Sequence, residues 1–239
     1  MQASRSRSYK YFDLIVASFV TVILCSNLIG PGKTAQVVVP WVGVPLTFGA
    51  GNLFFPISYI FGDVLTEVYG YSRARRAIWA GAGALLFASA MSAIILALPE
   101  DPAEPYNRVL GPALQTVFSS TWRIAVGSIL AFWAGDFVNS YVLAKLKILT
   151  AGRLLWTRTI GSTVVGQLVD SLVFYPFAFA GIWVTATLAK VVMFNWIFKV
   201  MIEVVATPLT YVVVGALKRA EHEDYYDLGT NFTPFTLEE

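Results

Sequence analysis

The stretch AIWAGAGALLFASAMSAIILAL, residues 77–98, contains no charged side chain. A helix that crosses a bilayer needs about 20 mostly apolar residues, and this stretch is long enough. Over all 239 residues, 56% are hydrophobic and only 13% are charged, whereas an average soluble domain has about 25% charged residues. The sequence therefore predicts an all-α integral membrane protein.

Five further stretches have a similar length and composition. With residues 77–98 they predict a six-helix transmembrane bundle, with helices at about 12–29, 47–69, 77–98, 122–146, 155–179 and 185–217. The start MQASRSRSYKYFDLIVAS is basic and then apolar, without a small-residue cleavage site, so we expect an uncleaved first helix. We expect one transmembrane domain over residues 1–220 and an acidic cytoplasmic tail over residues 221–239.

The basic residues predict the orientation, because Lys and Arg in short loops favour the cytoplasmic side. Most of them lie before the first predicted helix, after the second, around the link between the fourth and fifth, or after the sixth: Arg5, Arg7, Lys10, Arg73, Arg75, Arg76, Lys145, Lys147, Arg153, Arg158, Lys218 and Arg219. Lys33, Arg108 and Arg123 fall on the other side. Both termini are therefore expected in the cytoplasm, which requires an even number of spans.

The two longer outer connections differ in kind. Residues 33–49, KTAQVVVPWVGVPLTFG, are apolar but interrupted by Pro and Gly, which predicts a short outer hairpin or re-entrant segment between the first two helices. Residues 99–120 form a polar loop with room for a short surface helix.

Residue types that support catalysis are scarce. Cys25 is the single cysteine, and the single histidine, His222, lies in the charged tail. The sequence offers no cysteine cage, metal-ligand spacing or nucleophile motif. We therefore expect no enzyme activity, no metal and no other cofactor.

Ionisable residues inside the predicted spans are the main functional signal, because they are costly there and usually face the bundle interior. Four helices carry polar groups on one face: Asn52, Tyr59, Asp63 and Glu67; Asp136 and Asn139; Thr163, Gln167 and Asp170; Asn195, Lys199 and Glu203. At about 1.5 Å of rise per residue, Asp136, Asp170 and Lys199 lie at similar depths near the midplane. A structural ion-pair network is one explanation, but a solute cavity accounts better for so many groups.

Two of these acids have simpler explanations. We expect Glu67 to neutralise the nearby Arg73, Arg75 and Arg76 rather than to contact a substrate. Lys199 and Glu203 could pair along one helix, at a spacing of four residues.

Nearby aromatic residues, Trp133, Phe174 and Trp196, could stack on a flat heteroaromatic ligand. Carboxylates and amides could bind the polar edge of such a ligand. Composition alone leaves a nucleobase, an amine and a proton-coupled ligand open.

Three stretches carry a family resemblance: FPISYIFGDVLTEVYGYSRARRA at 55–77, TIGSTVVGQLVDSLVFYPFAF at 159–179 and WIFKVMIEVVATPLTY at 196–211. Together they resemble the queuosine-precursor transporter family, also called vitamin uptake transporters, over most of the chain. The resemblance implies a multi-pass secondary transporter of the bacterial inner membrane. It would import 7-cyano-7-deazaguanine and 7-aminomethyl-7-deazaguanine for queuosine modification of tRNA. The positions that match the family motifs are Asp63, Glu67, Gln167, Asp170 and Lys199.

Within that resemblance we assign roles as hypotheses. Gln167 and Asp170 would read the guanine-like edge, with Asn52 as a further amide, and Lys199 would balance Asp170 in the empty site. Further lining candidates are Trp133, Asp136, Phe174, Asn195 and Trp196, and Asp63, Glu67 and Glu203 are candidates for coupling or gating. The expected partners are the small-molecule substrate and the lipid bilayer, with no nucleic acid, and a homodimer is left open.

Three alternatives remain at this point. The chain could be the substrate-binding subunit of an energy-coupling-factor vitamin importer, which needs a scaffold and ATPases because this chain has no P-loop. It could also be a membrane enzyme that uses the buried carboxylates, or a purely structural membrane subunit.

Overall fold

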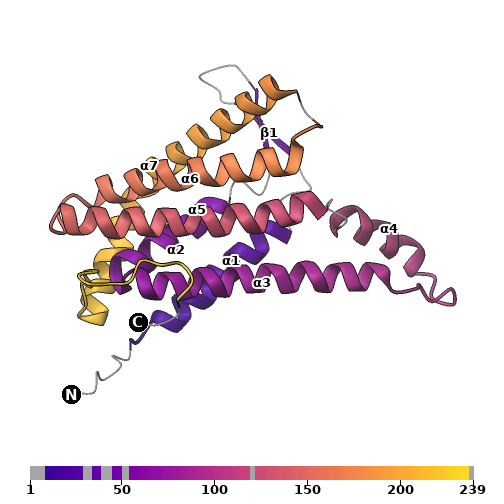
Figure 1. Ribbon diagram of the computed structural model, residues 1–239. Helices are drawn as coiled ribbons and strands as arrows, with labels where there is room; N and C mark the ends of the chain where they lie inside the picture. The colour runs from indigo at the N-terminus through magenta and orange to yellow at the C-terminus, as the bar shows by residue number, and fades with distance from the viewer. Residues whose placement is uncertain are drawn as a thin grey trace.

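The computed structural model describes residues 9–28, 34–38, 45–49, 54–118, 122–182 and 184–236. Its long helices lie side by side in a bundle (Figure 1). In chain order the elements are α1 (Phe12–Leu28), β1 (Thr34–Val38), β2 (Pro45–Gly49), α2 (Phe55–Val64), the π-helical turn η2 (Leu65–Tyr69), α3 (Tyr71–Ala97), α4 (Asn107–Phe118), α5 (Trp122–Leu149), α6 (Leu155–Phe179) and α7 (Thr185–Glu221).

The two ends of the bundle are easily told apart. At one end the start of α1 meets the end of α7, where Tyr11 N donates to Glu221 Oε1 at 2.7 Å and Tyr9 Oη donates to Glu223 Oε2 at 3.0 Å. We call this the tail end, because residues 222–236 lie there. The strands β1 and β2 and the helix α4 lie toward the opposite end, which we call the hairpin end (Figure 1).

The distribution of polar and apolar side chains is that of a membrane protein. Among the described helices, four are long and apolar enough to cross a bilayer, namely α3, α5 from Arg123, α6 and α7, and α1 is a shorter apolar helix. Large apolar side chains face outward, such as Phe87 at 71% and Val205 at 80% exposure, while Asp63 and Gln167 are buried. Apolar groups facing lipid and ionisable groups facing the interior are typical of membrane bundles. Six spans and cytoplasmic termini remain predictions.

The predicted start of the second helix, at Thr47, is wrong. Thr47 to Gly49 belong to β2, which pairs antiparallel with β1 from Thr34↔Gly49 to Val38↔Pro45. The helix begins only at Phe55, with Pro56 in its first turn, where a missing N–H costs nothing. The apolar run of residues 47–69 therefore contains a strand and a helix, and the expected hairpin between the first two helices is confirmed.

The third helix begins at Tyr71 rather than at Ala77. Arg73, Arg75 and Arg76 therefore lie in its first turns and not in a connecting loop. Gly70 allows the sharp change of direction before it, with φ +88°, a conformation that side-chain-bearing residues rarely adopt.

The other boundaries agree with the sequence more closely. Helix α6 matches its predicted range, and α4 is the expected surface helix in the loop over residues 99–120. Helices α5 and α7 extend three and four residues further than predicted, to Leu149 and Glu221. The extensions lengthen both helices at the tail end.

The close crossing of α5 and α6 depends on two glycines. A Cβ on Gly135 would lie 2.9 Å from Asp170 Cβ, and a Cβ on Gly166 would lie 2.7 Å from Asn139 Cβ. Small residues allow membrane helices to approach closely. Because Asp136 and Asn139 lie beside this crossing on α5, and Gln167 and Asp170 beside it on α6, the crossing brings the two polar faces together.

Candidate functional site

A partly buried ion pair marks the first polar group. Lys199 Nζ on α7 donates to Asp170 Oδ2 on α6, so the two residues that the sequence pairs are in contact. The ammonium also lies over the ring of Tyr59 on α2, 5.9 Å from its centroid. Asp136 on α5 is close enough to act electrostatically on both Asp170 and Lys199. Four helices thus converge on one place, which we call the Lys199 group.

Helix α6 adds unused hydrogen-bonding capacity beside this pair. Gln167 is buried, one turn from Asp170, and its Oε1 has no partner among the described residues. The same holds for the buried hydroxyl groups of Thr163 and Ser171. Leaving a buried polar atom unpaired costs about 1–3 kcal/mol. A ligand that bonds to these atoms would recover that cost.

A second polar group lies between α2, α5 and α7. Asn139 Nδ2 donates to Asp63 Oδ1 at 2.8 Å. The remaining oxygens, Asp63 Oδ2, Asn139 Oδ1 and both carboxylate oxygens of Glu203, are buried without a partner among the described residues. The Glu203 carboxylate is near enough to Asp63 to repel its charge. We call this set the Asp63 group.

The predicted aromatic residues are all involved in packing within the fold. The ring of Trp133 contacts Trp79, Phe137 and Phe235, at centroid distances of 5.7, 5.1 and 5.8 Å. Phe174 packs against Tyr175, with their centroids 5.0 Å apart. Because Trp133 packs partly against a tail residue, its role in stacking on a ligand remains a prediction without support from these contacts.

The remaining predicted lining residues are placed as follows. Trp196 Nε1 on α7 donates to Val164 O on α6 at 2.8 Å, a contact beside the Lys199 group. Asn195 Nδ2 donates to Val191 O of its own helix at 3.0 Å. Asn52 lies outside the described residues.

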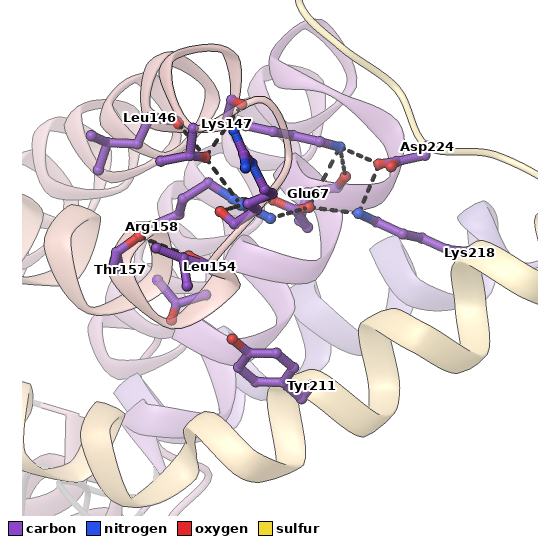
Figure 2. Close-up of polar contacts among 12 residues, drawn as sticks. Glu67, Leu146, Lys147, Leu154, Thr157, Arg158, Tyr211, Lys218 and Asp224 are labelled. Atoms are coloured by element: carbon purple, nitrogen blue, oxygen red, sulfur yellow. Dashed lines mark hydrogen bonds and ion pairs between the residues drawn. The ribbon is translucent and has the colours of Figure 1, made fainter.

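Glu67 does not pair with Arg73, Arg75 or Arg76, contrary to the expectation from sequence. Figure 2 shows three cations from other helices converging on it. Arg158 Nη2 and Nε donate to Oε1 and Oε2 at 2.8 and 3.1 Å, and Lys218 Nζ donates to Oε1 at 2.6 Å. Arg73 instead donates to Tyr69 O, and Arg75 donates to backbone oxygens of the tail.

Lys147 and Asp224 complete this ion cluster. Lys147 Nζ donates to the backbone oxygen of Glu67 and to Asp224 Oδ1, both at 2.6 Å, and Lys218 Nζ lies 2.7 Å from Asp224 Oδ1 (Figure 2). Burial raises the pKa of Asp224, but the bonds from Lys147 and Lys218 outweigh it and leave the pKa below its ordinary value. We call Glu67, Lys147, Arg158, Lys218 and Asp224 the Glu67 cluster. It therefore joins η2, α5, α6 and α7 to the tail at this end of the bundle.

The tail packs onto the same end of the bundle rather than extending away from it. Arg75 Nη1 donates to Asn231 O and Thr233 O, both at 2.7 Å. The rings of Tyr225 and Tyr226 lie so close to Gly70 and Gly152 that a side chain at either glycine would clash with them. A Cβ on Gly70 would lie 2.2 Å from Tyr225 Cδ1, and a Cβ on Gly152 would lie 2.0 Å from Tyr226 Oη. The tail therefore fits against the turns that precede α3 and α6.

The sequence does not predict that the cations of the Glu67 cluster meet Glu67. Lys147 and Lys218 lie just beyond the ends of predicted helices, and Arg158 lies near the start of the fifth predicted helix. A signal for Arg158 was present, because Arg158, Ser162, Gly166 and Asp170 are spaced by four residues and share one stripe of α6. All four residues lie on α6, and the bounds of this helix are predicted correctly from the sequence. No comparable pattern marks Asp224, which lies outside the helices.

Comparison with known proteins gives a consistent result. The family described as "Putative vitamin uptake transporter" matches residues 49–213. A Bacillus subtilis (strain 168) protein named "Probable queuosine precursor transporter" is 32% identical over 195 residues, 81% of this chain and 79% of that protein. An Escherichia coli (strain K12) protein named "Queuosine precursor transporter" is 25% identical over 206 residues, 84% of this chain and 85% of that protein. No solved structure matches significantly.

The matched region contains the Lys199 group, the Asp63 group, Glu67 and Arg158, so the polar interior lies within the part shared with the family. A family of transporters agrees with the expectation that the chain is not an enzyme. The chain is a membrane protein and belongs to the vitamin uptake transporter family.

Proposed function

We propose that this chain imports queuosine precursors, 7-cyano-7-deazaguanine and 7-aminomethyl-7-deazaguanine, across the bacterial inner membrane. The precursors would then supply queuosine modification of tRNA. The observation that carries the proposal is the partly buried Lys199–Asp170 pair beside the buried Gln167, whose Oε1 has no partner among the described residues. The names of the two relatives supply the substrate class.

The polar atoms of the Lys199 group suit a guanine-like edge. Such an edge presents a ring N–H and an amino group as donors and a carbonyl oxygen as acceptor. Asp170 would accept from the donors. The amide of Gln167 would donate from Nε2 to the carbonyl oxygen, and its Oε1 would accept from the ring N–H. Lys199 neutralises Asp170 while the site is empty, so the carboxylate is never buried without a partner. Substrate binding then replaces the ion pair between Lys199 and Asp170 with hydrogen bonds between Asp170 and the substrate.

Two aromatic rings are suited to hold the plane of the base. Phe174 lies one turn beyond Asp170 on α6, and Trp196 lies on α7 three residues before Lys199, bonded to α6. A base between them would gain stacking energy from either face. Trp133 is a weaker candidate, because its ring already packs against Trp79, Phe137 and Phe235.

We further propose six spans with both termini in the cytoplasm. The shorter helix α1 and the α2–η2 segment would join α3, α5, α6 and α7 as spans. The tail end carries Arg75, Lys147, Arg158 and Lys218, as expected of a cytoplasmic end. The Glu67 cluster would then close the cytoplasmic mouth, and the hairpin end would face the periplasm.

Uptake in cells that cannot make the precursors tests this function. The cells carry the chain or a variant, receive one precursor, and are scored for queuosine in tRNA. Asp170→Asn should lower uptake at limiting precursor by about tenfold or more, since a hydrogen bond to a charged group contributes about 1.5–3 kcal/mol. The matched control, Asp101→Asn, changes an exposed acid at the hairpin end and should leave uptake unchanged. Normal uptake by Asp170→Asn would refute the assignment.

A second variant covers the case in which Asp170→Asn leaves Lys199 unpaired and prevents folding. Asp170→Asn combined with Lys199→Gln removes both charges, and it should accumulate in the membrane without transport. Purified chain in liposomes then tests the rival subunit function. Precursor uptake without other proteins supports a complete transporter, and uptake only with a scaffold and ATPases would show a substrate-binding subunit.

A further inference from the structure

We infer that Asp63 and Glu203 form a second site, separate from the Lys199 group, that holds one exchangeable proton between two carboxyl groups and couples proton entry to import. The coupling part rests on the proposed function. The proton-binding part rests on the burial, the unpaired oxygen atoms and the helix packing of the Asp63 group.

The two carboxyl groups are buried and only partly bonded. Asp63 and Glu203 are 0% and 1% exposed. Asp63 uses one oxygen to accept from Asn139, and its other oxygen and both oxygens of Glu203 have no partner among the described residues. Helix α2, which carries Asp63, packs against both α5 and α7. The pair therefore lies inside the bundle, at the junction of three helices.

Within the part of the chain that the structure describes, no cation bonds to either carboxyl group. The charged groups that act on Asp63 are Glu203 from α7, Asp136 from α5 and Glu67 from η2, and all three are acids. Nearby cations are already bonded elsewhere. Lys199 bonds to Asp170, while Lys147, Arg158 and Lys218 bond within the Glu67 cluster.

Two neighbouring buried carboxylates cannot both stay ionised without a counter-charge, so one of them takes up a proton. A proton fits the unpartnered atoms better than a divalent metal ion does. The group offers four free oxygens, Asp63 Oδ2, Asn139 Oδ1 and two from Glu203, and Ca²⁺ takes about 6–8. The described residues also contain no group of three metal-ligating side chains.

The position of the pair suits coupling. Glu203 follows Lys199 by four residues on α7, and Asp63 precedes Glu67 by four residues where α2 passes into η2. The proton site is thus one turn from the proposed substrate group and one turn from the Glu67 cluster. Any shift of α7 that opens the Lys199–Asp170 pair also moves Glu203 relative to Asp63. One proton would enter and leave with each transport cycle, with no change in covalent bonds.

Infrared spectroscopy of the purified full chain tests the proton site without any substrate. A protonated carboxyl group absorbs separately from a carboxylate. At neutral pH the protein should show a protonated carboxyl band that Glu203→Gln removes, while the matched control Glu104→Gln, an exposed acid in the loop before α4, retains it. Asp63→Asn serves as the second variant if Glu203→Gln does not fold. A spectrum unchanged in both variants would overturn the site.

Purified chain in liposomes tests the coupling. The probe is labelled 7-cyano-7-deazaguanine, driven by an acidic exterior or by a sodium gradient, with counterflow measured without a gradient. A difference of one pH unit should raise accumulation by up to about tenfold for one proton per substrate. A pH-sensitive dye inside the liposomes should report the proton entering. Glu203→Gln should lose this response, and Glu104→Gln should keep it.

The outcomes separate the two proposals. Counterflow without any effect of pH, or a response to sodium alone, would overturn the coupling inference and leave the proposed function standing. Absence of counterflow with either precursor would instead overturn the proposed function, and the infrared result would still decide the proton site.

Discussion

Arg158 Nε and Nη2 donate to the two carboxylate oxygens of Glu67, at 3.1 and 2.8 Å, across a sequence separation of 91 residues. Both side chains are almost completely buried. A planar guanidinium that binds both oxygens of a carboxylate fixes position as well as charge. This contact sets where η2 lies against the start of α6.

Replacing Arg158 should destabilise the protein strongly. Arg158→Met leaves Glu67 with only the two lysines, and removing one partner of a buried ion pair costs about 3–5 kcal/mol. Unfolding of the purified protein in detergent measures the loss. Arg153→Met is the matched control, because Arg153 is exposed, and its effect should stay within about 0.5 kcal/mol. Equal stabilities of the two variants would contradict the role assigned to the Glu67 cluster.

Asp224 should make the tail end sensitive to acid. The bonds from Lys147 and Lys218 leave its pKa below the ordinary value in the folded protein. A carboxyl whose pKa is lowered on folding stabilises the folded state above its unfolded pKa, and that contribution is lost as the pH falls through the folded pKa. Asp224→Asn should therefore lower the melting temperature at neutral pH. The difference from the parent chain should shrink below about pH 4.

Asp227 provides the comparison for that experiment, because burial raises its pKa. Its ionised form is disfavoured by folding, so acidification through the raised pKa favours the folded state. The melting difference for Asp227→Asn should not shrink on acidification as that for Asp224→Asn does. The same pH dependence in both variants would show that the lysine bonds do not determine the behaviour of Asp224.

Substituting Gly70 should displace the tail. At Gly70 φ is +88° and ψ is +167°, which costs a residue with a side chain about 1–3 kcal/mol, and the new Cβ would meet the ring of Tyr225. Gly70→Ala should lower stability and expose residues 223–236 to a protease. Gly83→Ala, a helical position with nothing within 4 Å, should instead be neutral or stabilising by up to about 1 kcal/mol. An intact, protected tail in Gly70→Ala would contradict the fit.

Substituting Gly166 should reduce transport through the helix crossing. A Cβ there would lie 2.7 Å from Asn139 Cβ and 2.9 Å from Gly135 O, so α5 and α6 must separate. Because Gln167 and Asp170 are positioned by this crossing, Gly166→Ala should lower precursor uptake at a normal protein level. Gly62→Ala is the control, since its Cβ would meet nothing within 4 Å. Equal uptake by both variants would show that the crossing tolerates expansion.

Features that are set within one helix, such as its bounds and the depth of a residue along it, could be predicted from the sequence. Helix α6 has the predicted bounds, because uninterrupted hydropathy and clear ends define it. The rise per residue predicts that Asp170 and Lys199 lie at similar depths, and the pairing of the two was a hypothesis made within the family resemblance. The start of α2 could not be found in this way, because hydropathy does not distinguish the strand residues Pro45–Gly49 from the helix that follows.

The Glu67 cluster depends on contacts that hydropathy and charge counting do not contain. Glu67 was assigned to the arginines nearest in sequence, but its partners are 91 and 151 residues away. Helix α3 begins directly after Gly70, so those arginines lie within its first turns and not in a loop beside Glu67. Arg75 is occupied instead by backbone oxygens of the tail, and nothing in the composition of the tail predicts that it folds back.

The long sequence separations within the Glu67 cluster also have a consequence for biosynthesis. At about 5–20 residues per second, Arg158 follows Glu67 from the ribosome by on the order of ten seconds, and Lys218 follows later still. During that interval the Glu67 carboxylate has none of these partners, and an unpaired charge within a span is costly. We expect η2 to stay near the aqueous surface until α6 is inserted. The end of α2 would then be among the last parts of the bundle to reach its final depth.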